Sequence, residues 1–83
     1  MRNKKRRTEQ KENKLDLHGV PHNEVKSKVI RKVEEHWGTD IEVEFVTGNS
    51  ERMKSLVKEV LDEYQLNYID GSFFNDGVIK SRI

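Results

Sequence analysis

The sequence predicts a small α/β domain, an α+β two-layer sandwich with the element order β-α-β-α-β-β and a mixed four-stranded sheet. Three observations predict it. Apolar and polar residues alternate in short segments, apolar residues recur every three or four positions in two longer segments, and turn-forming residues separate them. The chain has 83 residues, of which 37% are charged and 33% hydrophobic, so we expect one domain with a modest core.

The LDLH segment is the first predicted strand. Leu15 and Leu17 fall on one face, and Asp16 and His18 fall on the other, because successive side chains of a strand point to opposite faces. Gly19 follows and permits a sharp exit from the strand. We therefore expect a short strand whose polar face carries Asp16 and His18 and is not covered by a helix.

A helix is predicted between Asn23 and Trp37, where apolar residues recur three or four positions apart. These residues form one stripe, which consists of Val25, Val29, Ile30, Val33 and Trp37. The other positions are mainly Lys, Arg and Glu, and Gly38 suits the end of the helix as its C′ residue. This helix should bury its apolar stripe against the sheet.

The second strand is predicted at residues 41–46, where three apolar residues alternate with two glutamates. A second helix is predicted at residues 51–64, in which six apolar residues have helical spacing. They are Met53, Leu56, Val57, Val60, Leu61 and Tyr64. Asn49 or Ser50 should cap this helix, because a short side-chain oxygen can accept a hydrogen bond from a free N–H group of the first turn.

The pattern of residues 66–83 predicts two antiparallel strands. LNYID and VIKSRI are short apolar-rich segments, and the Asn75-Asp76-Gly77 turn between them suits an antiparallel return. Two helices that are joined to strands by right-handed crossovers must lie on the same side of a sheet of four strands. The opposite face of the sheet should therefore lack helical cover.

Charge divides the chain into a basic head, residues 1–14, and an acidic body, residues 15–83. The head holds seven basic and two acidic side chains, a balance of +5, and the body holds nine basic and 13 acidic ones, a balance of −4. The head has no apolar face to bury, so it is predicted to be a disordered arm on a single domain. We expect the arm to bind phosphate, and the alternative is a solubilising tail without a partner. Its first five basic residues are Arg2, Lys4, Lys5, Arg6 and Arg7.

Composition excludes several classes of protein. Without cysteine the chain has no disulfide, thiol nucleophile or thiolate metal site. It has no apolar run of the roughly 18 residues that a membrane span needs, and its first residues lack the apolar segment of a signal peptide. We therefore expect a cytoplasmic protein that does not contact a membrane.

Two polar clusters follow the first two predicted strands. Residues 16–19 read Asp-Leu-His-Gly, and residues 47–50 read Thr-Gly-Asn-Ser. Ligands of α/β sheets gather at the carboxyl ends of parallel strands, so both clusters should lie at one edge of the sheet. Asp16 could orient the His18 imidazole or share a water with it, and Gly48 would let a phosphate approach the start of the second helix.

Each cluster also has a simpler interpretation. Asp-x-His is common on an exposed polar strand face, and Thr-Gly-Asn-Ser makes a good strand-to-helix connection. His18 and His22 have the i, i+4 spacing of a helical metal pair, but Pro21 and the turn between them break the helix that this spacing requires. We therefore predict no metal site from these two histidines.

The order of these motifs resembles the Smr (small MutS-related) domain. The resemblance rests on LDLHG, an amphipathic helix, a hydrophobic strand, a Gly-containing tetrapeptide, a second helix and a closing hairpin, and it covers residues 15–83. It implies a fold like that of the C-terminal domain of the third bacterial translation initiation factor. It also implies binding of DNA or RNA, and cleavage of nucleic acid by an endonuclease activity.

Carried over by position, the resemblance assigns catalytic roles to Asp16, His18 and Thr47. It assigns phosphate binding to Gly19, Gly48, Asn49 and Ser50. The second motif departs from the family pattern HGxG, because Thr47 replaces the histidine and Ser50 replaces the last glycine. A threonine cannot perform the proton transfer of an imidazole, although some plant organellar members resemble this chain in having TGxG.

The expected reaction is phosphodiester hydrolysis or transesterification. His18 would act as general acid or base, and Asp16 would fix its tautomer or hold a divalent ion, Mg²⁺ or Mn²⁺. The Thr47 hydroxyl would donate a hydrogen bond to a non-bridging phosphate oxygen, and N–H groups of the following loop would hold the same phosphate.

Two other functions compete with this one. The first is a nucleic-acid-binding module with the same surface and no catalysis. The second is a protein-interaction module that uses Phe73 and Phe74, which could also stack on unpaired bases or pack one ring on the sheet. The sequence identifies no protein partner.

Overall fold

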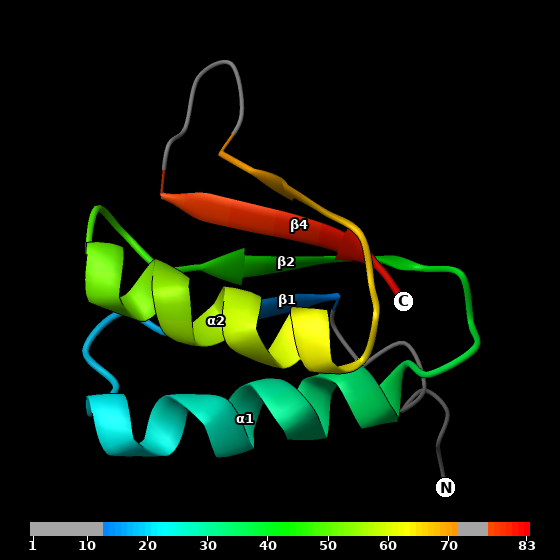
Figure 1. Cartoon of the computed structure of the whole chain (residues 1–83), viewed down its shortest axis with the longest axis horizontal. Helices are drawn as coiled ribbons and strands as arrows, with labels where there is room; N and C mark the ends of the chain where they lie inside the picture. Colours follow the sequence, from blue (N-terminus) through cyan, green and yellow to red (C-terminus); the bar gives the residue numbers. More distant parts are fainter. Residues whose placement is uncertain (1–12, 72–76) are drawn as a thin grey trace, which may run out of the picture.

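The computed structural model describes residues 13–71 and 77–83, and it forms two layers (Figure 1). The elements in chain order are β1 (Lys14–Asp16), α1 (His22–Glu35), β2 (Glu42–Val46), α2 (Glu51–Glu63), β3 (Tyr68–Asp70) and β4 (Val78–Arg82). This confirms the predicted order of two helices and four strands. β1 begins at Lys14, so the last residue of the predicted arm belongs to the sheet.

The four strands form one mixed sheet in the order β1-β2-β4-β3. β1 pairs in parallel with β2, whereas β4 is antiparallel to both β2 and β3. The two helices lie side by side on one face of this sheet, as expected (Figure 1). Since β1 and β2 are parallel neighbours, their carboxyl ends meet at the same edge of the sheet.

The core lies between the sheet and the helices. Val25, Val29 and Val33 of α1 and Phe45 of β2 have no exposed surface. The buried apolar residues of α2 repeat the predicted stripe and are Met53, Leu56, Val57, Val60 and Leu61. Tyr64 is only partly buried and follows the end of the helix. The periodicity of both helices is therefore confirmed over most of their length.

The prediction for the end of α1 is wrong in one respect. Trp37 is 56% exposed and His36 is buried. The helix ends at Glu35, and Gly38 takes the left-handed conformation (φ +80°), so residue 37 no longer follows the helical stripe. The Trp37 ring packs against the ring of Tyr64, with 5.6 Å between the centroids.

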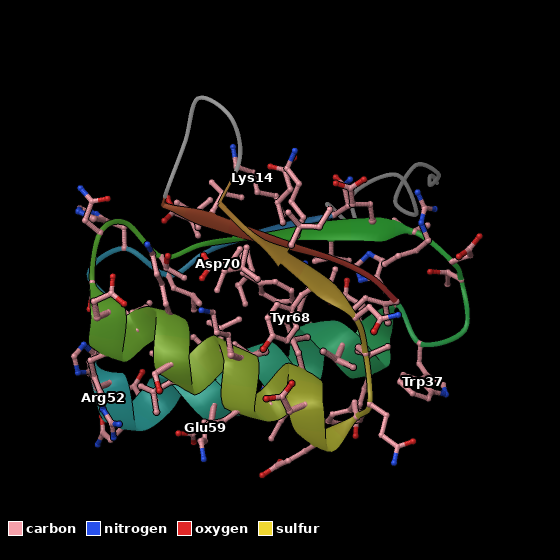
Figure 2. The ribbon with its side chains drawn as sticks, turned by 45° about the horizontal axis from the view of Figure 1, so that its top comes forward. Lys14, Trp37, Arg52, Glu59, Tyr68 and Asp70 are labelled. Atoms are coloured by element: carbon pink, nitrogen blue, oxygen red, sulfur yellow. The ribbon has the colours of Figure 1, made fainter. Side chains whose placement is uncertain are left out.

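The face of the sheet opposite the helices carries charged side chains in register. Lys14, Glu44 and Lys80 lie on neighbouring strands at one level of the sheet. Figure 2 shows Lys14 on this side, and Tyr68 between the sheet and the helices. Ile41, the first residue of the predicted second strand, precedes β2 and is exposed. Among the described residues, no helix has the length and apolar content to cross a membrane.

Candidate functional site

The parallel pairing of β1 with β2 brings the two sequence motifs together. Asp16 is the register partner of Val46, and the Leu17 N–H donates to the Val46 carbonyl at 2.9 Å. His18 follows Asp16 by two residues, and Thr47 directly follows Val46. The two predicted clusters are therefore neighbours at one edge of the sheet.

The first motif forms a turn immediately after β1. An Asp16 carboxylate oxygen accepts a hydrogen bond from the His18 backbone N–H at 2.9 Å, and the Val20 N–H donates to the Leu17 carbonyl at 3.0 Å. Gly19 has φ +82°, a conformation that glycine adopts without steric cost. Asp16 and His18 are both exposed, so both side chains can be reached from solvent.

This turn differs from the sequence prediction in one detail. β1 ends at Asp16, so His18 does not continue the alternation of an extended strand. The hydrogen bond of the Asp16 carboxylate goes to the main chain of His18 rather than to its imidazole. Asp16 thus holds the turn that presents His18, and its second carboxylate oxygen can serve a ligand.

The second motif is held much more tightly. Thr47 is 3% exposed, and its N–H donates to the Gly77 carbonyl at 2.7 Å. The Gly48 N–H donates to the same carbonyl at 3.1 Å. The Thr47 hydroxyl has one proton, which it can donate to the carbonyl of Gly77 at 3.1 Å or of Gly48 at 3.0 Å. This geometry uses the hydroxyl inside the protein, so donation to a phosphate would require it to turn away from both carbonyls.

α2 begins directly after this motif. The Ser50 hydroxyl accepts a hydrogen bond from the Met53 N–H at 3.1 Å, so Ser50 is the N-cap and Asn49 is not. The remaining N–H groups of the first turn give this end of the helix a partial positive charge. Asn49 is exposed beside it.

Gly77 is the residue of this site that the sequence did not indicate. Its carbonyl receives the hydrogen bonds of the second motif, and a Cβ atom on Gly77 would lie 3.0 Å from the Gly48 Cα. A side chain at position 77 would therefore require one of the two backbones to shift. The NDG sequence signals a turn, but the partner of Gly77 is about 30 residues away along the chain, and no local pattern encodes that contact.

The surface above the two motifs is open. Within the described part of the chain, a Cβ atom added at Gly19 or Gly48 would meet no atom within 4 Å. A ligand can therefore come close to the backbone at both positions. The His18 and Gly48 N–H groups are already used within the protein, so a phosphate at this edge would be held by the N–H groups at the start of α2, with Asp16, His18 and Asn49 nearby.

The donor set for a metal ion is limited. Residues 13–71 and 77–83 contain no group of three His, Asp or Glu side chains that could hold one. Asp16 supplies one exposed carboxylate, and Mg²⁺ is commonly held by one or two carboxylates together with substrate phosphate oxygens. Asp16 therefore fits an ion that arrives with the substrate.

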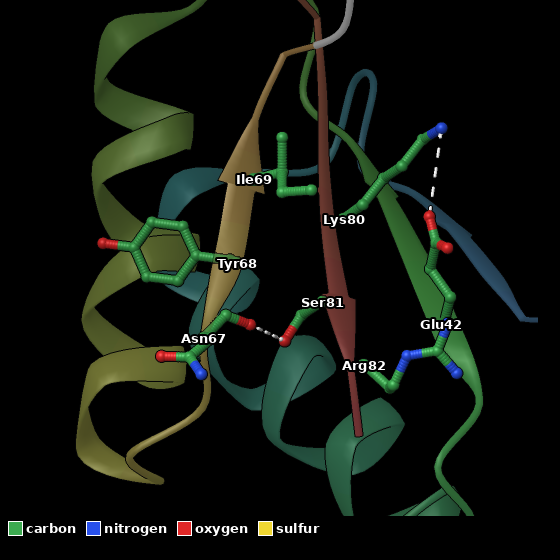
Figure 3. A pocket seen from close by; sticks show the side chains of 7 residues that line it. All are labelled: Glu42, Asn67, Tyr68, Ile69, Lys80, Ser81 and Arg82. Carbon is green, nitrogen blue, oxygen red and sulfur yellow. Dashed lines mark hydrogen bonds and ion pairs between the residues drawn. The ribbon is translucent and has the colours of Figure 1, made fainter.

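A separate hollow lies at the other end of β2 (Figure 3). It has a volume of about 230 Å³ and is lined by Glu42, Ile69 and Lys80 among others. Glu42 begins β2 and Thr47 follows its end, which corresponds to a separation of about 16 Å in an extended strand. The hollow is therefore not part of the site formed by the two motifs.

Some predicted residues lie outside the described part of the chain. They are the arm residues Arg2, Lys4, Lys5, Arg6 and Arg7 and the loop residues Phe73 and Phe74. The Asn75-Asp76 part of the predicted turn lies there too, although β3 and β4 on either side are antiparallel as expected.

Comparisons with known proteins add no assignment. No protein-family model matches the chain, and no curated protein and no solved structure matches it.

Proposed function

We propose that the chain is a nucleic-acid-binding domain of the Smr type that cleaves phosphodiester bonds at the edge formed by β1 and β2. The observation that carries this proposal is the adjacency of the two motifs through the Asp16–Val46 register pair. The sequence resemblance supplies the type of domain, and the two-layer architecture with a mixed four-stranded sheet is compatible with it.

The proposed roles follow from the geometry of the two turns. His18 is exposed and presented by a turn, so it is the candidate for proton transfer to or from the reacting oxygen. The open backbone at Gly48 and the N-terminus of α2 would receive the phosphate. Thr47 would keep this loop in place through Gly77 rather than touch the substrate.

In the proposed hydrolysis, His18 accepts a proton from a water molecule as that water attacks phosphorus. The bond between phosphorus and the leaving oxygen then breaks, and the proton is returned to this oxygen. A divalent ion held by Asp16 and the substrate would stabilise negative charge on the phosphate.

The test is incubation of the purified chain with labelled single-stranded and double-stranded DNA and RNA, with Mg²⁺, with Mn²⁺ and with a chelator. Cleavage of at least one substrate that disappears in His18→Ala would support the proposal. Cleavage that survives in His18→Ala would reveal a contaminating nuclease or a different site.

A second candidate is binding without cleavage. The observation that favours it is that the Thr47 side chain is buried and engaged with Gly77, while the family pattern has a histidine there. In this case the chain would bind nucleic acid, all four substrates would remain intact, and Gly48→Ala would weaken binding. No binding and no cleavage would contradict both candidates.

The arm is proposed to add affinity that does not depend on sequence. Residues 1–12 contain six basic side chains, and each phosphate that they neutralise adds a slope of roughly 0.7 to 0.9 to the dependence of log K on log salt. Removing residues 1–12 keeps Asn13, whose side chain donates to the Glu42 carbonyl at 3.0 Å. Such a truncation should flatten the salt dependence by several units, and an unchanged slope would leave the arm a role in solubility alone.

A further inference from the structure

The basic residues of the body are unevenly paired. Residues 15–83 contain nine Lys and Arg side chains, and six of these form ion pairs with described acidic residues. Lys28, Arg31 and Arg52 form none within residues 13–71 and 77–83. Two of these three residues lie on the same helix, α1.

Lys28 and Arg31 also line the same surface. Two hollows of about 220 and 200 Å³ lie along α1, and both residues contribute to each of them. Leu15 of β1 lines the first hollow, so the first hollow lies between α1 and the free edge of β1, and the second extends from it along α1. We call it the β1–α1 groove.

The β1–α1 groove leads to the candidate site. Leu15 is the neighbour of Asp16, and α1 starts at His22, shortly after the turn that holds His18. Glu24 and Ser27 line the part of the groove near the start of α1. A linear ligand in the groove would therefore pass next to Asp16 and His18 at one end.

The charge of the groove indicates a polyanion. Lys32 and Glu35, which also line the groove, are paired with each other at 3.8 Å. The other charged residues that line the groove are Lys28, Arg31 and Glu24. A local positive excess on a body with a balance of −4 is suited to bind phosphates.

The opposite flank of α1 provides a contrast. Residues two positions apart on a helix point in nearly opposite directions, so Lys26 lies on the other side from Lys28. Lys26 is paired with Glu59 of α2 at 2.7 Å, and this hydrogen bond holds the pKa of Lys26 above its usual value. The same helix thus has one paired cation, Lys26, on the α2 side, and two cations without a described ion pair, Lys28 and Arg31, on the β1 side.

We propose that the β1–α1 groove holds the phosphate backbone of a nucleic acid and guides it to the edge of the sheet at Asp16, with Lys28 and Arg31 as the phosphate-binding residues. This rests on the proposed nucleic-acid function and names the path of the polymer outside the reacting site. The shared chemistry is that of a phosphodiester backbone, so DNA and RNA are separate arms of the test.

The test compares two double variants of the full chain, Lys28→Ala/Arg31→Ala and the control Lys26→Ala/Lys58→Ala. Both remove two positive charges from helices, and the control removes cations that are paired with Glu59 and Asp70. Affinity for labelled DNA and RNA strands is measured from 50 to 200 mM salt. Circular dichroism establishes that each variant is folded, and Lys28→Gln/Arg31→Gln replaces the first variant if it is not.

Loss of two phosphate contacts should reduce the salt slope by about 1.4 on single strands or about 1.8 on duplexes. Over this fourfold range of salt, the wild-type chain should lose about 7 to 12 times more affinity than Lys28→Ala/Arg31→Ala. The control and the charge-preserving variant Lys28→Arg/Arg31→Lys should keep the wild-type slope.

Three results would overturn the proposed role of the groove. The first is that Lys28→Ala/Arg31→Ala keeps the wild-type salt slope. The second is that the control loses as much of the salt slope as that variant. The third is that the charge-preserving variant loses the salt slope. In each of these the wild-type chain still binds nucleic acid, so the proposed function does not fail together with the groove proposal. If the wild-type chain binds neither DNA nor RNA, the proposed function fails, and the groove fails with it.

Discussion

The two turns of the candidate site are neighbours and yet are built in opposite ways. The turn after β1 is exposed, and the Asp16 carboxylate holds it through one hydrogen bond to the His18 N–H. The loop after β2 is buried at Thr47 and is fixed by N–H and hydroxyl groups that all point at the Gly77 carbonyl. The first turn leaves its functional groups available, whereas the second uses them for its own structure.

Under the proposed function, this difference would assign separate roles to the two turns. A group that transfers protons must reach the substrate, and His18 meets this condition. A loop that presents backbone N–H groups must not reorganise, and hydrogen bonds to a buried carbonyl provide that rigidity. Substitutions in the first turn should therefore change activity more than stability, and substitutions in the second should do the reverse.

His18→Ala should have the largest effect. Removing a general acid or base typically costs 10² to 10⁴-fold in rate, and the exposed imidazole contributes little to folding, so the melting temperature should stay near that of the wild type. The measurement is the cleavage rate on the preferred substrate, together with a thermal melt.

His22→Ala is the matched control. His22 is also exposed, and it is the first residue of α1. It should keep the wild-type rate. Equal losses of rate in both variants would mean that His18 acts only through local charge, and the first turn would lose its assigned chemistry.

Gly77→Ala should be the most damaging change for stability. A Cβ atom there would lie 3.0 to 3.2 Å from three backbone atoms of Gly48, so one of the two segments must shift. Forcing extra volume into a packed site costs about 1–3 kcal/mol. A thermal melt would detect this as a clear decrease in melting temperature.

Gly38→Ala provides the comparison, because a Cβ atom at Gly38 meets no described atom within 4 Å. Its positive φ alone costs about 1–2 kcal/mol. If Gly77→Ala were as stable as the wild type, the Gly48–Gly77 contact would not hold the second loop.

The outline of the fold followed from local patterns. Alternation and helical spacing depend on neighbours in the sequence, and they predicted the four strands and both helices, with Asn49 or Ser50 as the cap of α2. The end of α1 was missed, because whether residue 36 or residue 37 is buried depends on the point at which the backbone leaves the helix. Gly38 fixes that point, and spacing alone does not reveal it.

The adjacency of the two motifs was predicted from the sequence, and the hydrogen bonds within them were not. Parallel strands place their ends together, which is sufficient to bring Asp16 close to the second motif. The burial of Thr47 depends on Gly77, which is 30 residues away. The availability of Lys28 and Arg31 depends on which acidic residues the fold brings to the other cations. Such long-range contacts leave no mark in a single sequence.

Thr47→Val tests the buried loop after β2, and it should lower the free energy of unfolding by about 1 kcal/mol. Valine has nearly the same shape and lacks the hydroxyl, so one hydrogen bond is lost while the Gly77 carbonyl keeps two N–H donors. Affinity for nucleic acid should stay unchanged in a filter-binding or anisotropy assay. If affinity fell while the fold remained intact, the Thr47 hydroxyl would contact the ligand, as the sequence pattern predicted.

The smallest effect on stability is expected at Asp16, and it separates charge from turn structure. An asparagine oxygen can accept the same hydrogen bond from the His18 N–H, so Asp16→Asn should change the free energy of unfolding by less than about 0.5 kcal/mol. Asp16→Ala loses that hydrogen bond at an exposed position and should cost about 0.5–1 kcal/mol. Both variants lack the carboxylate that would fix the tautomer of the His18 imidazole or hold a divalent ion, so both should cleave more slowly. A wild-type rate in Asp16→Asn together with a reduced rate in Asp16→Ala would show that only the turn matters, and the carboxylate would then have no part in the chemistry.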